Sequence, residues 1–317
     1  MELDSEQQAI VDYNGGSQVV IAGPGSGKTR TLVAKAEKLW AENRDIICLT
    51  FTRSAAKEMR DRMPGIEART IHSYCHGVVG WTGNYGEMLD TVLHAEEVGR
   101  LKDRFEFVLV DEIQDLTEVQ WKVVTSLVGR YLFAVGDPYQ SIYGWNGALG
   151  GRIVGKLDKF GCKKFYLHNN YRSCPGIIKM LEGIYRRNLV SKNVKENGLT
   201  AVLVRTRRKL RELAGLLESE GIGFTVRYAA NEFGRPREKF CGSDRLRLMT
   251  CHCSKGLEFD KVILYSWSPE PWGEIGGLRY PSTEETNLEY VSIARASKEF
   301  YYVNGNYNNE LLEVLSG

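Results

Sequence analysis

A glycine-rich segment that ends in lysine and threonine is the first feature of this sequence with a chemical meaning. Residues 22–29 read AGPGSGKT and lie between an apolar run and a helical pattern. A loop of this kind turns backbone N–H groups toward phosphate oxygens, while Lys28 adds charge near the β and γ phosphates and the Thr29 hydroxyl can ligate Mg²⁺. We therefore predict a nucleoside triphosphate site. The residues expected to line it are Ala22, Gly23, Pro24, Gly25, Ser26, Gly27, Lys28, Thr29 and Arg30.

The first position of this motif is usually glycine, and in this chain it is Ala22. Gly23 and Gly25 still supply a flexible turn. A glycine-rich surface turn without function is the alternative interpretation. The apolar run before the loop and the helical pattern after it argue against that alternative.

A second candidate feature is an apolar run that ends in two acids, FVLVDE at 107–112. Asp111 is placed to hold Mg²⁺ directly or through water, and Glu112 is placed to orient or deprotonate an attacking water. Alone, such a run is often only a strand that leads into a capped helix. Together with the glycine-rich loop it predicts a site that hydrolyses a triphosphate with the help of Mg²⁺.

These side chains need a scaffold that brings them together. The sequence alternates short β-branched runs with helical patterns, which is typical of parallel sheets with crossover helices. The alternation restarts after Gly150 and Gly151, so we expect two tandem α/β domains at 1–155 and 156–317. The expected strands are 18–22, 45–51, 107–112 and 131–137 in the first domain and 163–169, 201–206, 224–228, 245–251, 261–267 and 299–305 in the second.

The overall composition limits the class of protein. Hydrophobic residues make up 43% of the chain and charged residues 26%, as in ordinary globular domains, and no apolar run is long enough to cross a bilayer. The first ten residues carry no basic segment followed by an apolar stretch. We therefore expect no signal peptide, no membrane partner and a cytoplasmic location.

The charges of the chain are nearly balanced, with 42 Lys and Arg against 40 Asp and Glu. A nucleic-acid binder with this balance must gather its positive charge locally. The segment RTRRKLR at 205–211 is one such concentration. We favour a solvated helix start for it over a phosphate contact.

From DEIQD at 111–115 the sequence resembles superfamily 1 helicases, specifically the UvrD/Rep/PcrA group. Seven further matches to the signatures of that group occur in the right order, and together they span nearly the whole chain. They are LDSEQQAI (3–10), LTFTRSAAKEM (49–59), RTIHSY (69–74), AVGDPYQSIYGWNGA (134–148), HNNYRS (168–173), LMTCHCSKGLEFD (248–260) and EYVSIARA (289–296). The resemblance implies two tandem RecA-like domains with mostly parallel sheets, the fold of a P-loop NTPase.

The resemblance also implies that ATP and Mg²⁺ lie in a cleft between the two domains. Gln140 would sense the γ-phosphate from the first domain. Arg172 and Arg295 would reach it from the second, because a planar and permanently charged guanidinium matches the charge that develops on the γ-phosphoryl oxygens. A surface ion pair is the alternative role for either arginine taken alone.

Further nucleotide contacts follow from the same resemblance. Gln7 would read adenine, since a glutamine amide can pair with the N6 and N7 edge of that base. Tyr171 would stack on the adenine ring. Gly256 and Glu258 would line the nucleotide and touch its ribose.

Single-stranded DNA is the partner that the resemblance implies, including junctions between single and double strands. Phe51, Tyr143 and Trp145 match positions that stack on bases, and such stacking has little sequence preference. His72 and His252 match positions close to the DNA backbone. A core tryptophan is the alternative role for Trp145. The aromatic residues of the motif at 134–148 imply movement from 3′ to 5′.

The chain departs from the larger relatives in size and at two positions. The intervals 77–104 and 228–244 are too short to hold the helical insertions of those relatives, because domains rarely fall below about 50 residues. Duplex contacts made by the insertions would then be missing, and a protein partner could supply them. Asn146 replaces the usual arginine and Ala294 the usual threonine.

Three functions compete at this point. The first is a DNA-stimulated ATPase that acts as a helicase or single-strand translocase. The second is a motor subunit that binds ATP and DNA but unwinds only inside a larger complex. The third, a GTPase or small-molecule kinase, is disfavoured because the sequence has no N-K-x-D guanine motif and the second domain would be unexplained.

Overall fold

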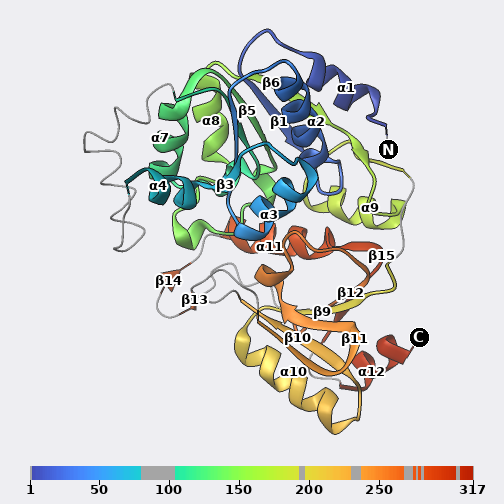
Figure 1. Cartoon of the computed structure of the whole chain (residues 1–317). Helices are drawn as coiled ribbons and strands as arrows, with labels where there is room; N and C mark the ends of the chain where they lie inside the picture. Colours follow the sequence, from blue (N-terminus) through green and yellow to red (C-terminus); the bar gives the residue numbers. More distant parts are fainter. Residues whose placement is uncertain are drawn as a thin grey trace. The chain divides into compact units, whose positions relative to one another are not determined.

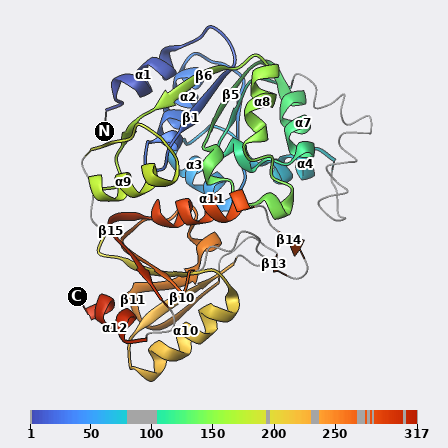
Figure 2. The ribbon, with the colours of Figure 1, turned by 180° about the vertical axis from the view of Figure 1, so that it is seen from behind.

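The chain forms two compact units, Met1–His168 and Asn169–Gly317, which Figures 1 and 2 show from opposite sides. The structure is a computed structural model. The residues that it describes are 2–79, 104–192, 197–229, 237–267, 274–275, 278–279, 282–304 and 308–316.

The sheet of the first unit has six strands in the order β3-β2-β4-β5-β1-β6, and its strand pairs are parallel. The strands are β1 (Gln18–Ala22), β2 (Ile46–Thr50), β3 (Ala68–Thr70), β4 (Phe105–Val110), β5 (Val128–Gly136) and β6 (Lys163–Leu167). The α-helices are α1 (Ser5–Asp12), α2 (Lys28–Ala41), α3 (Arg53–Arg62), α4 (Ile71–Val79), α7 (Glu118–Leu127) and α8 (Arg152–Lys159). Short 3₁₀ turns are η1 (Ile113–Asp115), η2 (Pro138–Gln140) and η3 (Gly144–Asn146).

Helices cover both faces of this sheet. Successive strand residues point to opposite faces, so Val19 and Val20 of β1 enter different cores. Val19 lies in a buried cluster with residues of α4, α7 and α8, whereas Val20 lies in a cluster with residues of α1, α2 and α3. A parallel sheet covered on both faces needs strands that are apolar throughout, and this need explains the continuous apolar runs in the sequence.

The boundary between the two units differs from the expected division near residue 155. The strand expected at 163–169 was assigned to the second domain, but β6 pairs along β1 from Lys163 to Leu167 in the first sheet. Ile153 and Leu157 of α8 are buried in the first core. The hydrogen bonds and the packing of this segment therefore place it in the first unit, which ends at His168.

The second unit contains a five-stranded sheet in the order β10-β11-β9-β12-β15. β11, β9, β12 and β15 pair in parallel, and β10 pairs with β11 in antiparallel orientation. The strands are β7 (Asn169–Asn170), β8 (Val190–Ser191), β9 (Thr200–Val204), β10 (Phe224–Tyr228), β11 (Arg237–Thr250), β12 (Phe259–Tyr265), β13 (Glu274–Ile275), β14 (Leu278–Arg279) and β15 (Ala296–Val303). The helices are α9 (Pro175–Ile184), α10 (Arg207–Ser219), η4 (Cys251–Ser254), α11 (Ser282–Ile293) and α12 (Asn308–Ser316).

Helices also pack against the sheet of the second unit. Leu210 and Leu213 of α10 and Leu311 of α12 share a buried cluster with Val202 and Ile263 of the sheet. α11 contacts β12 and β15, and α9 contacts β15. Each unit is thus an α/β layer structure with a mostly parallel sheet, which is the predicted fold class. Among the described residues, no helix has both the length and the apolar character that a bilayer crossing requires.

Candidate active site

The glycine-rich loop connects the end of β1 at Ala22 to the start of α2 at Lys28. Gly25 and Gly27 have φ angles of 66° and 83°, in the left-handed region that side chains rarely adopt. A Cβ on Gly27 would also lie 2.5 Å from Nε2 of Gln7. The hydroxyl of Ser26 donates to the carbonyl of Gly23 at 2.7 Å and closes the loop on itself. Gly25 and Gly27 are therefore required by the path of the chain.

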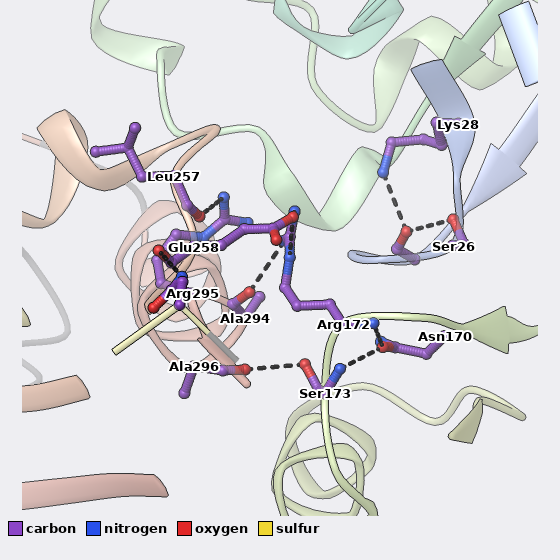
Figure 3. A network of polar contacts seen from close by, with 12 residues as sticks. Ser26, Lys28, Asn170, Arg172, Ser173, Leu257, Glu258, Ala294, Arg295 and Ala296 are labelled. Atoms are coloured by element: carbon purple, nitrogen blue, oxygen red, sulfur yellow. Dashed lines mark hydrogen bonds and ion pairs between the residues drawn. The ribbon is translucent and has the colours of Figure 1, made fainter. Parts of the chain in front are cut away.

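Lys28 is the first residue of α2 and its side chain turns back over the loop. Its ammonium donates to the carbonyls of Gly23 at 3.0 Å and Ala22 at 3.3 Å, and Figure 3 shows the Lys28 amine pointing at the carbonyl that also accepts from Ser26. The start of a helix presents N–H groups that have no partner within the helix. A buried ammonium beside such a helix start is the donor set that a chain of phosphates needs.

Thr29 and Asp111 meet at the predicted Mg²⁺ position. The Thr29 hydroxyl donates to Oδ2 of Asp111 at 3.0 Å, although 82 positions of sequence separate the two residues. Burial, and then the neighbouring Glu112, raise the pKa of Asp111 to about 7, while Lys28 and the Thr29 hydroxyl act in the opposite direction. A carboxylate and a hydroxyl are oxygen ligands of the kind that Mg²⁺ prefers. These two residues therefore fit the ion.

Glu112 follows Asp111 in an uncommon backbone conformation. Its φ of 52° and ψ of 48° lie in the left-handed region, which costs a residue other than glycine roughly 1–2 kcal/mol. Its carboxylate accepts a hydrogen bond from Nε2 of Gln114 at 2.5 Å. The carboxylate is thus fixed beside Asp111, where a base for the attacking water is expected.

Gln140 lies in η2, directly after β5. Its Nε2 donates to Oδ2 of Asp137 at 2.8 Å, and the Asp137 backbone N–H donates to Oε1 of Gln114 at 3.0 Å. Sequence reasoning selected Glu112 and Gln140 but missed Gln114, which joins them. The available signal was its position inside DEIQD, two residues after Glu112.

Gln7, which was expected to read adenine, lies against the glycine-rich loop. It is fully buried in α1, where it forms a capping box with Asp4, and its Nε2 donates to the carbonyl of Ser26 at 3.2 Å. Arg30, which was expected to line the triphosphate, is half-buried, and its guanidinium donates to the backbone carbonyl of Glu2. That contact ties the segment before α1 to α2.

In the second unit, the predicted residues Arg172 and Glu258 bind each other. Nε of Arg172 donates to Oε1 of Glu258 at 2.7 Å, and Nη1 donates to the carbonyl of Ala294 at 3.2 Å. Figure 3 shows the Arg172 guanidinium lying between these two acceptors. The ion-pair alternative for Arg172 is therefore observed inside its own unit, and a role toward phosphate requires the guanidinium to change or share this partner.

Arg295 is also held by acceptors of the second unit. Its side chain is 2% exposed, and its guanidinium donates to the carbonyls of Val291 at 3.0 Å and Leu257 at 3.1 Å. Gly256 has a φ of 83°, again a conformation suited to glycine, and Tyr171 is half-buried. The segments that carry Arg172, Gly256 to Glu258 and Arg295 are thus connected by hydrogen bonds within one unit (Figure 3).

Three of the predicted DNA-contacting residues form an aromatic group in the first unit. The rings of Phe51 and Tyr143 stack with centroids 5.3 Å apart and an interplanar angle of 24°, and Trp145 meets Tyr143 edge-on at 6.3 Å. The Trp145 side chain is 52% exposed, so its alternative role in the core is wrong. An exposed indole beside two stacked rings is a surface on which bases can stack.

Both histidines that were expected near the DNA backbone have a pKa below the ordinary value of an imidazole. Burial lowers the pKa of His72 in α4. Burial, followed by Arg205 and Lys255, lowers the pKa of His252 in η4 to about 4. Either imidazole can therefore donate a hydrogen bond to a phosphate, but it brings no full positive charge.

The basic run at 205–211 is largely paired within its unit. Nε of Arg205 donates to both carboxylate oxygens of Glu285 at 3.1 Å. Arg208 and Lys209 pair with Glu212 at 2.6 Å and 3.3 Å. The exposed Arg208 pair supports the solvated helix start that we favoured over a phosphate contact, whereas Arg205 is largely buried against Glu285.

Comparisons with known proteins match both units. A family model described as an AAA domain matches residues 6–146, and one described as a UvrD-like helicase C-terminal domain matches residues 235–304. A probable DNA helicase of Mycoplasma pneumoniae is 27% identical over 243 aligned positions, with 62% of this chain and 43% of that protein covered. A probable DNA helicase II homolog of Rickettsia conorii is 22% identical over 402 aligned positions, with 92% of this chain and 60% of that protein covered.

Among solved structures, the Pif1 helicase from Candida albicans aligns with a TM-score of 0.55 and 14% identity. The alignment covers 100% of this chain and 99% of that one, and at this identity it supports the fold alone. This chain spans 43% and 60% of the length of the two curated relatives. The Rickettsia alignment is longer than the 317 residues of this chain, so that relative carries inserted residues without a counterpart here.

Proposed function

Because this chain belongs to the UvrD/Rep/PcrA group of superfamily 1 helicases, we propose that it hydrolyses ATP and uses the reaction to move along single-stranded DNA. The observation that carries this proposal is the meeting of Lys28, the Thr29–Asp111 pair and Glu112 at one end of the first sheet. These groups supply phosphate binding, a metal position and a base.

The first unit would perform the bond-breaking step. A water attacks the γ-phosphorus, the bond to the β–γ bridging oxygen breaks, and Glu112 accepts the proton of the water. Lys28 neutralises charge on the β and γ phosphates. When bound at Thr29 and Asp111, Mg²⁺ would neutralise the phosphate oxygens further. Gln140 would contact the γ-phosphate, and Gln7 would select adenine.

The second unit would supply the cations that complete the reaction. Arg172 and Arg295 would approach the γ-phosphate when the units close, and a finger of this kind contributes about 10³–10⁵ in rate. Tyr171 would stack on adenine, and Gly256 and Glu258 would line the ribose. A phosphate that draws Arg172 away from Glu258 would leave that carboxylate available to the ribose hydroxyls.

The track would run over the aromatic group of the first unit. Phe51, Tyr143 and Trp145 would stack on bases, a contact worth about 1–3 kcal/mol per base and tolerant of sequence. His72 and His252 would donate to the DNA backbone. Closure around ATP and opening after loss of the γ-phosphate would ratchet a strand held by both units. We propose 3′-to-5′ movement and binding at junctions of single and double strands.

A second candidate function is a motor subunit that binds ATP and DNA but unwinds only with a partner. The inserted residues of the Rickettsia relative, which this chain lacks, favour it. The same insertions in larger proteins could hold the duplex, and a partner protein would have to replace them here.

One pair of assays on the isolated chain separates these functions. The enzyme hypothesis predicts steady phosphate release from ATP that rises at least tenfold with single-stranded DNA, together with displacement of a strand from 3′-tailed but not 5′-tailed duplexes. Strong phosphate release without strand displacement favours the partner-dependent motor. A near-zero rate with and without DNA contradicts the proposal that this chain is an ATPase by itself.

A further inference from the structure

Gln114 is a fully buried amide whose two ends are both bonded to groups of the candidate active site. Nε2 donates to Oε2 of Glu112 at 2.5 Å, and Oε1 accepts from the backbone N–H of Asp137 at 3.0 Å. A buried amide with both ends satisfied has one favourable orientation, because rotation would break both bonds. Gln114 therefore fixes the position of the Glu112 carboxylate relative to the end of β5.

The hydrogen bonds continue from Gln114 to the predicted γ-phosphate sensor. Asp137 accepts from Nε2 of Gln140 at 2.8 Å, so Glu112, Gln114, Asp137 and Gln140 form one connected series. Asp137 is fully buried and Gln140 is 3% exposed. Hydrogen bonds shielded from water in this way are stronger than exposed ones.

The space around Gln114 allows little adjustment. A Cβ on Gly136 would lie 2.4 Å from Oε1 of Gln114 and 2.8 Å from Cγ2 of Ile113. Glu112 itself has a left-handed backbone, which other contacts must stabilise. The position of the Gln114 side chain therefore requires a glycine at position 136.

The backbone of the same residue contacts the segment that follows the aromatic group. The Gly150 N–H donates to the carbonyl of Gln114 at 2.9 Å, and the Leu149 N–H donates to that of Leu116 at 2.8 Å. Thr117 and Ala148 form an isolated β-bridge. Residues 114–117 therefore lie directly beside the return of the loop that carries Tyr143 and Trp145.

We propose that Gln114 is the positioning residue that aims Glu112 at the attacking water and connects this carboxylate to the aromatic loop, Tyr143–Gly150. This inference rests on the proposed function. The side chain of Gln114 holds the base, and its backbone carbonyl holds the loop on which DNA would stack. Occupation of the loop by DNA would thereby restrict η1 and keep Glu112 in its working position.

The test compares Gln114→Met with Gln120→Met in the full chain. Methionine keeps the length of glutamine but lacks its donor and acceptor. Gln120 is also buried close by, at 3% exposure, yet its amide oxygen accepts from the Thr117 backbone N–H in the cap of α7 rather than bonding to the four residues of the series. Misplacement of a catalytic group by about 1 Å can cost on the order of 10²-fold. We expect Gln114→Met to lower DNA-stimulated kcat by roughly 10- to 100-fold, with the KM for ATP within about threefold of the wild type.

The second expected signature is loss of coupling. In Gln114→Met the ratio of DNA-stimulated to basal turnover should fall by about tenfold, whereas Gln120→Met should keep the wild-type ratio. A residue with only a structural role would lower both rates together. Equal loss of basal and stimulated rates, or wild-type kinetics in a folded Gln114→Met protein, would overturn the proposal.

Gly136→Ala perturbs the same contact without removing the amide. Its Cβ should displace Gln114 and reproduce the loss of kcat and of coupling, whereas Gly155→Ala, where nothing lies within 4 Å of the added carbon, should behave as wild type. If both Gln114→Met and Gly136→Ala fail to fold, the role of Gln114 is structural and the positioning proposal is wrong. A wild-type chain without ATP hydrolysis would instead contradict the proposed function, whatever the variants do.

Discussion

The two units hold their charged site residues in different ways. In the first unit the groups expected at the triphosphate are held by bonds that converge on one loop and one strand end, as Lys28, Thr29 and Asp111 show. In the second unit Arg172 and Arg295 are bonded to acceptors of their own unit, Glu258 and the carbonyls of Ala294, Val291 and Leu257. The first unit therefore gathers its ligands at one loop before a nucleotide arrives, and Lys28 has only the carbonyls of that same loop to exchange for phosphate. The arginines of the second unit have to exchange or share acceptors that lie on other segments of their unit.

This difference predicts that substitutions in the two units have different kinetic effects. Substitution of Lys28, Thr29 or Asp111 should remove ATP binding and hydrolysis together, because the phosphate and metal ligands themselves are lost. Substitution of Arg172 or Arg295 should remove hydrolysis while ATP binding survives, because those groups act in the transition state.

The largest effect is expected for Lys28→Ala. Loss of the ammonium over the loop should lower ATP turnover by at least about 10³-fold and weaken ATP binding, with the fold retained. Steady phosphate release and circular dichroism check both parts. Lys38→Ala is the matched control, since Lys38 lies on the same helix and pairs with Asp12 at the surface. Turnover that survives in Lys28→Ala would refute the phosphate assignment.

Arg172→Ala should come next. We expect kcat to fall by about 10³-fold while the Kd for ATP changes by only a fewfold, because an arginine finger acts on charge that develops during the reaction. Arg208→Ala, which removes an exposed pair with Glu212 in the same unit, is the control. If Arg172→Ala loses ATP binding as severely as Lys28→Ala, the division between the two units is wrong. Normal hydrolysis would remove Arg172 from the finger role.

Trp145→Ala tests the aromatic group of the first unit. One lost base stack of about 1–3 kcal/mol should raise the DNA concentration for half-maximal stimulation by about 5- to 150-fold and leave basal turnover unchanged. Trp40→Ala is a matched control, because Trp40 is 50% exposed and lies at the far end of α2 from the loop. An equal effect of both substitutions, or a loss of basal turnover in Trp145→Ala, would count against stacking on DNA.

The smallest expected effect concerns the attachment to α2 of helix α1, which carries Gln7. The Lys35 ammonium is 1% exposed and donates to the carbonyls of Val11 and Tyr13 and to Asn14, so it fastens the end of α1 to α2. Lys35→Met should lower the free energy of unfolding of the first unit by about 1–3 kcal/mol, since buried acceptors lose their donor. Lys38→Met should cost at most about 1 kcal/mol. Chemical denaturation measures the loss of unfolding free energy in both variants. Equal losses would show that Lys35 stabilises the first unit no more than the exposed Lys38 does.

Sequence reasoning succeeded where a short motif encodes its own geometry. The glycines of residues 22–29, the acids after β4 and the apolar strands all follow local rules, so their predicted places are observed. The 163–169 strand was assigned to the wrong unit because its three apolar residues, FYL at 165–167, are equally suited to either sheet, and only its pairing with β1 decides. Strand pairing depends on the whole chain rather than on the residues of one strand.

The hydrogen-bond partners of long polar side chains could not be predicted from the sequence. Nothing in NYRS or SKGLE indicates that Arg172 binds Glu258, because 86 positions separate them. Gln114 was missed for a related reason. Its role depends on the absence of a side chain at Gly136 and on the backbone N–H of Asp137, and neither contact can be predicted from the spacing of a motif.

We propose that both units act on a single triphosphate, and a structure of the chain with ADP, Mg²⁺ and aluminium fluoride tests this proposal most directly. In that structure we expect the guanidinium groups of Arg172 and Arg295 within hydrogen-bond distance, about 3 Å, of the fluoride or phosphate oxygens that Lys28 also contacts. Guanidinium groups that stay on Glu258 and on the Leu257 carbonyl, with only first-unit residues around the nucleotide, would contradict it.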